Sequence, residues 1–142
     1  MSPAADKRSA VALLILRITL GYFLLLWSLE KLIVPSATIR IAQSFYGVQL
    51  PAWGSYALGI AELVLSLALL CGAYRTISYG LALAVHTITV IVSWRRLLDP
   101  MGLLGANHLW IATWPVWGGF IALFLMRHWD AYTIDGWRRS RT

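Results

Sequence analysis

The sequence has little cysteine and little charge. Cys71 is the only cysteine among 142 residues, which excludes an intramolecular disulfide, a CxxC redox pair and a thiolate metal cluster. We expect this lone thiol, near a predicted helix end, to be a packing residue. Charged residues make up 13% of the chain, about half of what a soluble domain carries. The chain is therefore too poor in charge for a soluble domain.

What the sequence has instead is apolar residues, 59% of the total, gathered in long blocks. A helix of about 20 residues crosses a hydrocarbon core about 30 Å thick. The blocks predict an all-α integral membrane four-helix bundle, a single domain over residues 1–142, with helices at 10–34, 52–72, 76–94 and 108–126. The first block is too long for a signal peptide. Residues 127–142 are expected to form a cytoplasmic tail along the anionic inner leaflet.

The connection between the first two predicted spans carries helix signals of its own. Pro35 and Ser36 favour a helix start, and Gly47 and Pro51 favour a stop. Apolar residues between them fall on one face, which predicts a short amphipathic helix on the outer membrane surface. It either covers the bundle or is a plain surface linker.

The net charge of +6 lies at the ends of the apolar blocks. This distribution is a topology signal, whereas nucleic-acid binding needs a basic stripe on a soluble face. The side with both termini holds Lys7, Arg8, Arg75, Arg127, Arg138, Arg139 and Arg141, and the other side holds Lys31, Arg40, Arg95 and Arg96. The positive-inside rule therefore predicts a multi-pass membrane protein with both termini in the cytoplasm.

Each predicted span carries one stripe of small, polar or ionisable residues, at steps of three and four that keep them on one helix face. The stripes should face one another inside the bundle. With a rise of about 1.5 Å per residue, Glu62 and His86 lie roughly 15 Å from either membrane edge, and Arg17 about 10 Å from the inner edge.

These three residues form the predicted buried polar site. An isolated charge at such depth costs from about 2.5 to more than 10 kcal/mol. We therefore predict that Arg17 and Glu62 interact, with His86 on the same internal surface. The functional interpretation is a site for a proton, a quinone headgroup or a small ligand. The structural interpretation is an Arg–Glu bridge that fixes helix packing, and both stay open.

A second polar cluster is predicted at the outer rim. It comprises Glu30, Lys31, Arg95, Arg96 and His108, with Asp99 and Asn107 beside them. Such residues are either solvated at the helix ends or form a mouth that selects an anionic or quinone-like ligand. The histidines are too dispersed for a haem or a metal site, so we expect no metal.

Several short motifs resemble the DoxX family of small bacterial membrane proteins. They are Leu16-Arg17-Ile18 with Leu20-Gly21-Tyr22-Phe23, Glu30-Lys31-Leu32, Leu58-Gly59-Ile60-Ala61-Glu62-Leu63, Leu70-Cys71-Gly72-Ala73-Tyr74-Arg75-Thr76 and, more loosely, Asn107-His108 and Thr133-Ile134-Asp135. The resemblance covers residues 12–135. One departure is Ser28-Leu29-Glu30, where the family usually has a glycine before the lysine, and it adds an acid at the mouth.

The resemblance implies a four-helix bundle in the bacterial inner (plasma) membrane. It also implies a role in quinone-linked oxidation, or a role as a membrane partner of redox enzymes. We expect the membrane subunit of a quinone-linked redox system, which supplies a quinone or proton site and takes electrons from a partner protein. No covalently bound cofactor is expected. The alternatives are a non-catalytic structural or assembly subunit of a larger membrane complex and a small-molecule transporter. Whether the chain is itself an enzyme stays open.

Overall fold

The computed structural model describes residues 3–99, 101–102 and 108–139, with residues 3–6, 108–109 and 139 described by their backbone alone. This part of the chain is all helical. The elements are α1 Pro3–Ile33, α2 Pro35–Ile41, the π-helix η1 Ala42–Tyr46, α3 Ala52–Cys71, α4 Arg75–Val92, α5 Trp94–Leu97, α6 His108–Ile111, α7 Thr113–Leu125 and α8 Ile134–Arg139.

Within the described residues, three helices are long and apolar enough to cross a membrane: α1 from Lys7 to Ile33, α3 and α4. They coincide with the first three predicted spans. The predicted fourth span is not one helix, because α6 and α7 are separated at Ala112, and α7 is a shorter apolar helix. Pro115 explains the break. A proline ring clashes with the carbonyl four residues before it, which here is that of Ile111, the last residue of α6.

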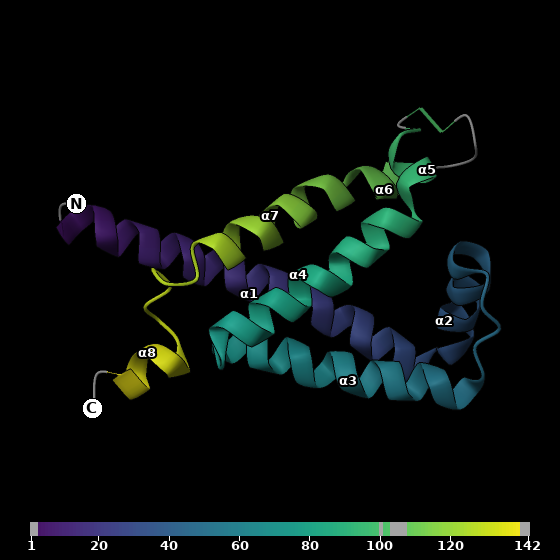
Figure 1. Ribbon diagram of the computed structural model, residues 1–142, viewed down its shortest axis with the longest axis horizontal. Helices are drawn as coiled ribbons and strands as arrows, with labels where there is room; N and C mark the ends of the chain where they lie inside the picture. Colours follow the sequence, from purple (N-terminus) through teal and green to yellow (C-terminus); the bar gives the residue numbers. More distant parts are fainter. Residues whose placement is uncertain (1–2, 100, 103–107, 140–142) are drawn as a thin grey trace.

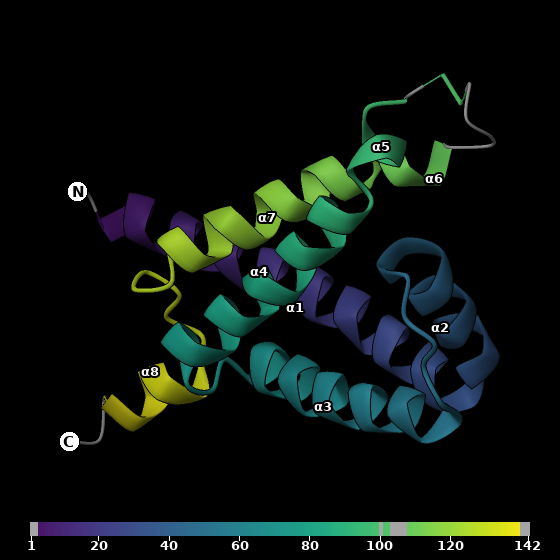
Figure 2. The same ribbon diagram turned by 45° about the vertical axis from the view of Figure 1, so that its right-hand side comes forward.

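The long helices pack as two pairs, and the two pairs meet at one end of the molecule. α1 lies along α3, and α7 lies along α4, as both views show (Figures 1 and 2). The start of α1, the turn between α3 and α4, and α8 lie at one end of the molecule, which we call the terminal end (Figure 1). α2, α5 and α6 lie at the opposite end. α2 and η1 occupy the connection in which a helix was predicted, while its amphipathic contact with the membrane surface stays a prediction.

The core of the bundle is small, and the outer faces of the helices are apolar. Leu13, Leu20, Leu24, Leu69, Tyr79, Ala82, Phe120 and Leu123 are buried together. Facing outward are large apolar side chains such as Ile15, Val64 and Ile88, all more than half exposed. Such an apolar surface is suited to contact with lipid. The helices beneath it satisfy their backbone hydrogen bonds internally, as a membrane requires.

Glycines bring α1 and α3 together. A Cβ added at Gly21 would lie 2.7 Å from the Leu70 side chain, and one at Gly59 would lie 2.8 Å from the Leu32 side chain. Ser55 Oγ donates to the Lys31 carbonyl at 2.9 Å across the same contact. Small residues of this kind let membrane helices approach closely. The two helices therefore run antiparallel in a fixed register, with the start of α3 beside the end of α1.

Candidate functional site

Arg17 is the centre of a polar network at the terminal end. The residue is 2% exposed, and its Nε lies 3.1 Å from Oδ2 of Asp130, which is fully buried. Nη1 donates to the Leu70 carbonyl at 2.6 Å, and Nη2 donates to the Tyr132 carbonyl. Tyr79 Oη donates to Asp130 Oδ2 at 2.7 Å. Arg17 thus ties α1 to the end of α3 and to the chain after α7.

Arg75, at the start of α4, extends the network. Its Nη1 donates to the carbonyls of Arg127 at 3.0 Å and Asp130 at 2.5 Å. Asp135 accepts from the backbone N–H groups of Tyr74, at 3.1 Å, and Arg75, at 2.9 Å. A carboxylate at a helix N-terminus satisfies free N–H groups and complements the helix dipole. Asp135 therefore fastens the C-terminal segment to the start of α4.

The turns that position this segment have local causes. Gly72 ends α3 with φ +63° and faces Thr133 so closely that an added Cβ would lie 2.5 Å from its Cγ2. Only glycine accepts both this conformation and this contact. Thr133 Oγ1 in turn accepts from the Gly136 N–H at 2.9 Å, which is the usual N-cap bond of a helix, here α8. The chain after α7 is thereby folded back over the terminal end.

The predicted pairing of Arg17 with Glu62 is wrong. Glu62 pairs with Lys31, whose Nζ lies 2.6 Å from Oε2, and both side chains are mostly buried. The register of α1 and α3 is the reason, since Gly59 meets the end of α1 at Leu32. Arg17 and Lys31 are fourteen positions apart in one helix, or roughly 21 Å. An arginine side chain is too short to span that distance.

His86 occupies a third, separate environment. It is 5% exposed, and its ring contacts Phe23 edge-on, with centroids 5.6 Å apart, and Phe120 at 5.3 Å. Its Nε2 has no hydrogen-bond partner among the described residues. Arg17, Glu62 and His86 therefore do not form one contact cluster, and any joint functional role for them stays a prediction.

The predicted outer cluster is described only in part. Lys31 belongs to the pair with Glu62, and its Nζ also lies 5.5 Å from the Trp27 ring. Arg95 is exposed and lies over Trp94, 5.5 Å from the ring centroid, while Glu30 and Arg96 are half-buried. The side chain of His108, and Asn107, lie outside the described residues. A common mouth formed by Glu30, Lys31, Arg95, Arg96 and His108 stays a prediction.

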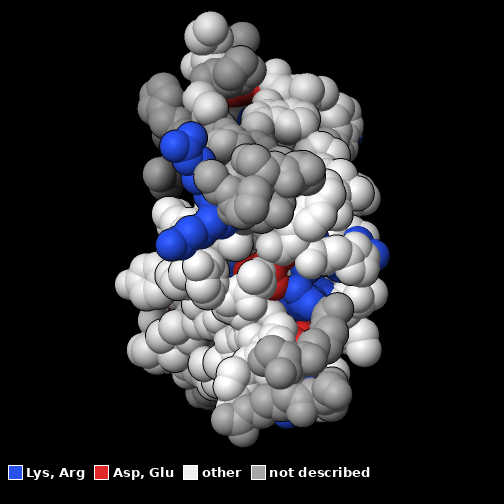
Figure 3. All heavy atoms as spheres, turned by 90° about the vertical axis from the view of Figure 1, so that its left-hand side faces the viewer, with Lys and Arg blue, Asp and Glu red and all other residues white. Residues whose placement is uncertain are grey.

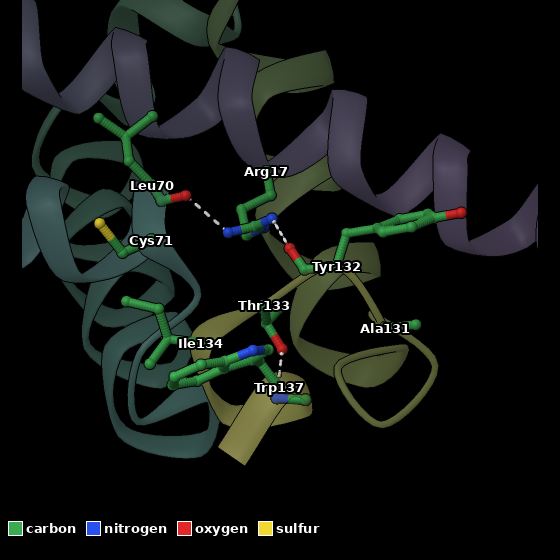
Figure 4. A pocket seen from close by; sticks show the side chains of 9 residues that line it. Arg17, Leu70, Cys71, Ala131, Tyr132, Thr133, Ile134 and Trp137 are labelled. Atoms are coloured by element: carbon green, nitrogen blue, oxygen red, sulfur yellow. Dashed lines mark hydrogen bonds between the residues drawn. The ribbon is translucent and has the colours of Figure 1, made fainter. Parts of the chain in front are cut away.

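Two pockets lie at the terminal end. The larger, of about 660 Å³, is bounded by α1, the end of α3 and the segment 131–137 (Figure 4). We call it the Arg17 pocket, and its walls include Arg17, Leu70, Cys71, Tyr132, Ile134 and Trp137. Cys71, expected to be a packing residue, is exposed and lines this pocket. The smaller, of about 230 Å³, lies between the start of α4 and the end of α7.

Sequence reasoning missed Asp130 as the partner of Arg17. A signal was present, because the chain has only 6 acidic residues for 12 basic ones, and a buried arginine requires one of them. Asp130 follows the last predicted span on the same side of the membrane as Arg17. Its place after the span concealed it, since a tail residue was not expected to enter the bundle.

Comparison with known proteins agrees with the resemblance in the motifs. The DoxX family model matches residues 12–94, more than half of the chain, including Arg17, Lys31, Glu62, Tyr79 and His86. No curated protein and no solved structure matches the sequence. The Asp130 side of the network lies beyond the matched residues. The extent of the match, together with the apolar helices, shows that this membrane protein belongs to the DoxX family.

Proposed function

We propose that this DoxX protein is the membrane subunit of a quinone-linked redox system, and that the Arg17 pocket receives the quinone headgroup. The observation that carries the proposal is a buried guanidinium at the wall of a pocket otherwise lined largely by apolar and aromatic side chains. A quinone has matching chemistry, because it combines a flat apolar ring with carbonyl oxygens that accept hydrogen bonds.

The donor set of the pocket fits such a ligand. An arginine has five N–H groups, and the hydrogen bonds of Arg17 to the carbonyls of Leu70 and Tyr132 use one on each Nη, while Nε faces Asp130 as an ion pair without a hydrogen bond. One N–H on each Nη is left for a carbonyl oxygen. Asp130 holds the guanidinium in place. Trp137, 55% exposed at the pocket wall, offers an aromatic face for stacking.

The proposal also includes the topology and the source of electrons. α6 and α7 together make the fourth crossing of a four-helix bundle in the bacterial inner membrane, with both termini in the cytoplasm. Electrons come from a partner protein at the terminal end. Proton transfer is assigned to His86, whose Nε2 has no partner among the described residues, and to the Glu62–Lys31 pair.

Cys71 provides the test, because it is the only cysteine, is exposed and lines the pocket. The protein in lipid nanodiscs is alkylated with N-ethylmaleimide, and modification is followed by mass spectrometry. Decylubiquinone is the probe, since its fully substituted ring does not add thiols at a ring C–H. We expect saturating decylubiquinone to slow alkylation several-fold. An unchanged rate would overturn the quinone site.

Two tryptophans give a matched pair of variants. Trp137 and Trp129 are exposed to similar degrees, 55% and 57%, but only Trp137 lines the pocket. Trp137→Leu should weaken the protection of Cys71 by decylubiquinone, and Trp129→Leu should leave it as in the wild type. Equal loss of protection in both variants would mean that the quinone acts through the bilayer and not through this pocket.

A second candidate function is a non-catalytic subunit that anchors a partner in a larger membrane complex. It is favoured by the exposed aromatic side chains on the folded-back segment: Trp129, Tyr132 and Trp137. The two functions differ in their effect on the quinone pool. In cells that make equal amounts of each protein, Trp137→Leu should change the extracted quinol-to-quinone ratio if the first proposal holds. A purely anchoring subunit leaves that ratio unchanged.

A further inference from the structure

The smaller pocket of the terminal end is basic, and the proposed quinone site does not use it. It lies where α4 begins and α7 ends, and its walls include Tyr74, Arg75, Ile77, Arg127, His128 and Asp135. We call it the Arg127 pocket. Basic side chains are exposed on this face of the molecule (Figure 3). The question is what ligand such a lining accepts.

The one carboxylate in this lining is already engaged. Asp135 accepts from two backbone N–H groups, at 2.9 and 3.1 Å, and lies 3.8 Å from Arg75 Nε. Arg75 itself is 5% exposed and is held by carbonyls of the C-terminal segment. Asp135 and Arg75 therefore balance each other, and the pocket keeps the charge of Arg127 together with the ring of His128.

Arg127 is held in place without an acidic partner. Its Nη1 donates to the Phe124 carbonyl at 2.8 Å, and its guanidinium carbon lies 4.4 Å from the centroid of the Phe124 ring. No ion pair of the described residues includes Arg127, and its buried Nε has no hydrogen-bond partner among them. A fixed guanidinium with unused donors is suited to an oxyanion, above all to phosphate.

The surroundings of the pocket indicate where the phosphate comes from. Tyr74 and Ile77, in the pocket wall, are 64% and 62% exposed. They mark the point at which the apolar surface of α4 begins, so a ligand in the pocket is in reach of both water and hydrocarbon. Tyrosine favours this interfacial level. Basic pockets between membrane helices bind the headgroups of anionic lipids.

We propose that the Arg127 pocket binds a phosphate group, and that its source is an anionic phospholipid. The lipid phosphate bonds to Arg127 and is approached by His128, while an acyl chain runs along Ile77. Because Asp135 in the pocket wall also fastens the C-terminal segment to α4, an occupied pocket stabilises the fold-back that forms the terminal end. This site is independent of the quinone proposal, which the alkylation of Cys71 tests separately.

The test measures thermal unfolding of the full chain in a non-ionic detergent with added phosphatidylglycerol, phosphatidylcholine or inorganic phosphate. A ligand that binds only the folded state raises Tm, and the rise grows as its free concentration exceeds its Kd. We expect phosphatidylglycerol to raise Tm by several degrees and phosphatidylcholine to have little effect. If inorganic phosphate alone gives the whole rise, the ligand is a soluble phosphate and the lipid assignment is overturned.

Arg127→Gln is the decisive variant, and Arg138→Gln is its matched control. Arg138 is an exposed arginine at the same end and does not line the pocket. Arg127→Gln should weaken phosphatidylglycerol binding roughly tenfold or more, which is the effect of losing one charge-assisted hydrogen bond. Arg138→Gln should bind phosphatidylglycerol as the wild type does. Should Arg127→Gln fail to fold, His128→Ala replaces it, with lipids retained in native mass spectrometry as the readout. Equal lipid binding in the pocket variant and the control would overturn the proposal.

Discussion

Asp130 is fully buried and has three partners. Its carboxylate faces Arg17 and accepts from Tyr79, and its backbone carbonyl accepts from Arg75. A buried ion pair of this kind costs desolvation when formed, so its net gain over apolar packing is small. Removal of one partner is strongly destabilising, because the remaining charge stays buried without compensation. The pair therefore acts chiefly to hold α1 and the C-terminal segment in one arrangement.

A double-mutant cycle on Arg17 and Asp130 checks this role. Arg17→Leu and Asp130→Leu should each lower the free energy of unfolding by about 3–5 kcal/mol, since each leaves one buried charge alone. The double variant should lose much less than the sum, because neither charge remains. The measurement is unfolding in mixed micelles with increasing sodium dodecyl sulfate.

Glu62→Leu supplies the control for that cycle. Glu62 pairs with Lys31 at the other end of the α1–α3 contact, so its effect should add to that of Arg17→Leu. Strict additivity between Arg17→Leu and Asp130→Leu, or strong coupling between Arg17→Leu and Glu62→Leu, would contradict the pairing described here.

Among the elements, the contact of α1 with α3 depends on two glycines. At Gly59, an added Cβ would lie 2.8 Å from Leu32 Cδ2 and 3.1 Å from Lys31 Cβ. The second of these atoms is bound directly to the α1 backbone and cannot move by a rotamer change. A methyl group at Gly59 therefore has to move α1 itself.

Gly59→Ala should lower the stability of the protein by about 1–3 kcal/mol, the usual cost of overpacking. Gly118 is the control, because an added Cβ there meets nothing within 4 Å. Gly118→Ala should be neutral or stabilising by up to about 1 kcal/mol, since alanine favours the helix. The same detergent unfolding measures both. Equal losses in the two variants would show that helix approach at Gly59 is not limiting.

The helices could be predicted from sequence because hydropathy and turn residues encode them locally. The first three predicted spans lie where α1, α3 and α4 are found, and Gly72 marks the end of α3. Pro115 carried the signal for the break before α7, but the apolar character of the block concealed it. The site was predictable only as far as Arg17. Its partner Asp130 depends on the chain folding back after α7, a tertiary contact that no periodicity encodes.

For the whole molecule, the terminal end is closed by the C-terminal segment, which binds α1, α3 and α4 at once. The contacts are Arg17 with Tyr132 and Asp130, Thr133 against Gly72 at the end of α3, and Asp135 with the start of α4. The segment buries Asp130 and leaves its aromatic residues Trp129 and Trp137 exposed. It forms part of the wall of both pockets, so its loss should affect both proposed sites together.

The orientation in the membrane gives a direct prediction. A reporter fused after Thr142 should be active in the cytoplasm, and one inserted in the 35–51 segment should be external, because the basic residues are concentrated on the side of both termini. Paired alkaline phosphatase and green fluorescent protein fusions at both positions measure this. The reverse pattern would move both pockets to the outer face.

Truncation tests the closing role of the C-terminal segment. A chain that stops after Trp129 lacks Asp130 and Asp135, so Arg17 and Arg75 lose their acidic partners together. We expect the free energy of unfolding to fall by at least about 3–5 kcal/mol, as for removal of one buried partner, or no folded protein.

The matched control stops after Arg139 and keeps both acids with α8. It should unfold in sodium dodecyl sulfate as the full chain does, and its Cys71 should be alkylated at the same rate. Faster alkylation of Cys71 is expected only in the shorter chain, if enough of it folds to be measured. A shorter chain as stable as the control would mean that the helices alone hold the terminal end together, and that the buried pair of Arg17 and Asp130 contributes no stability.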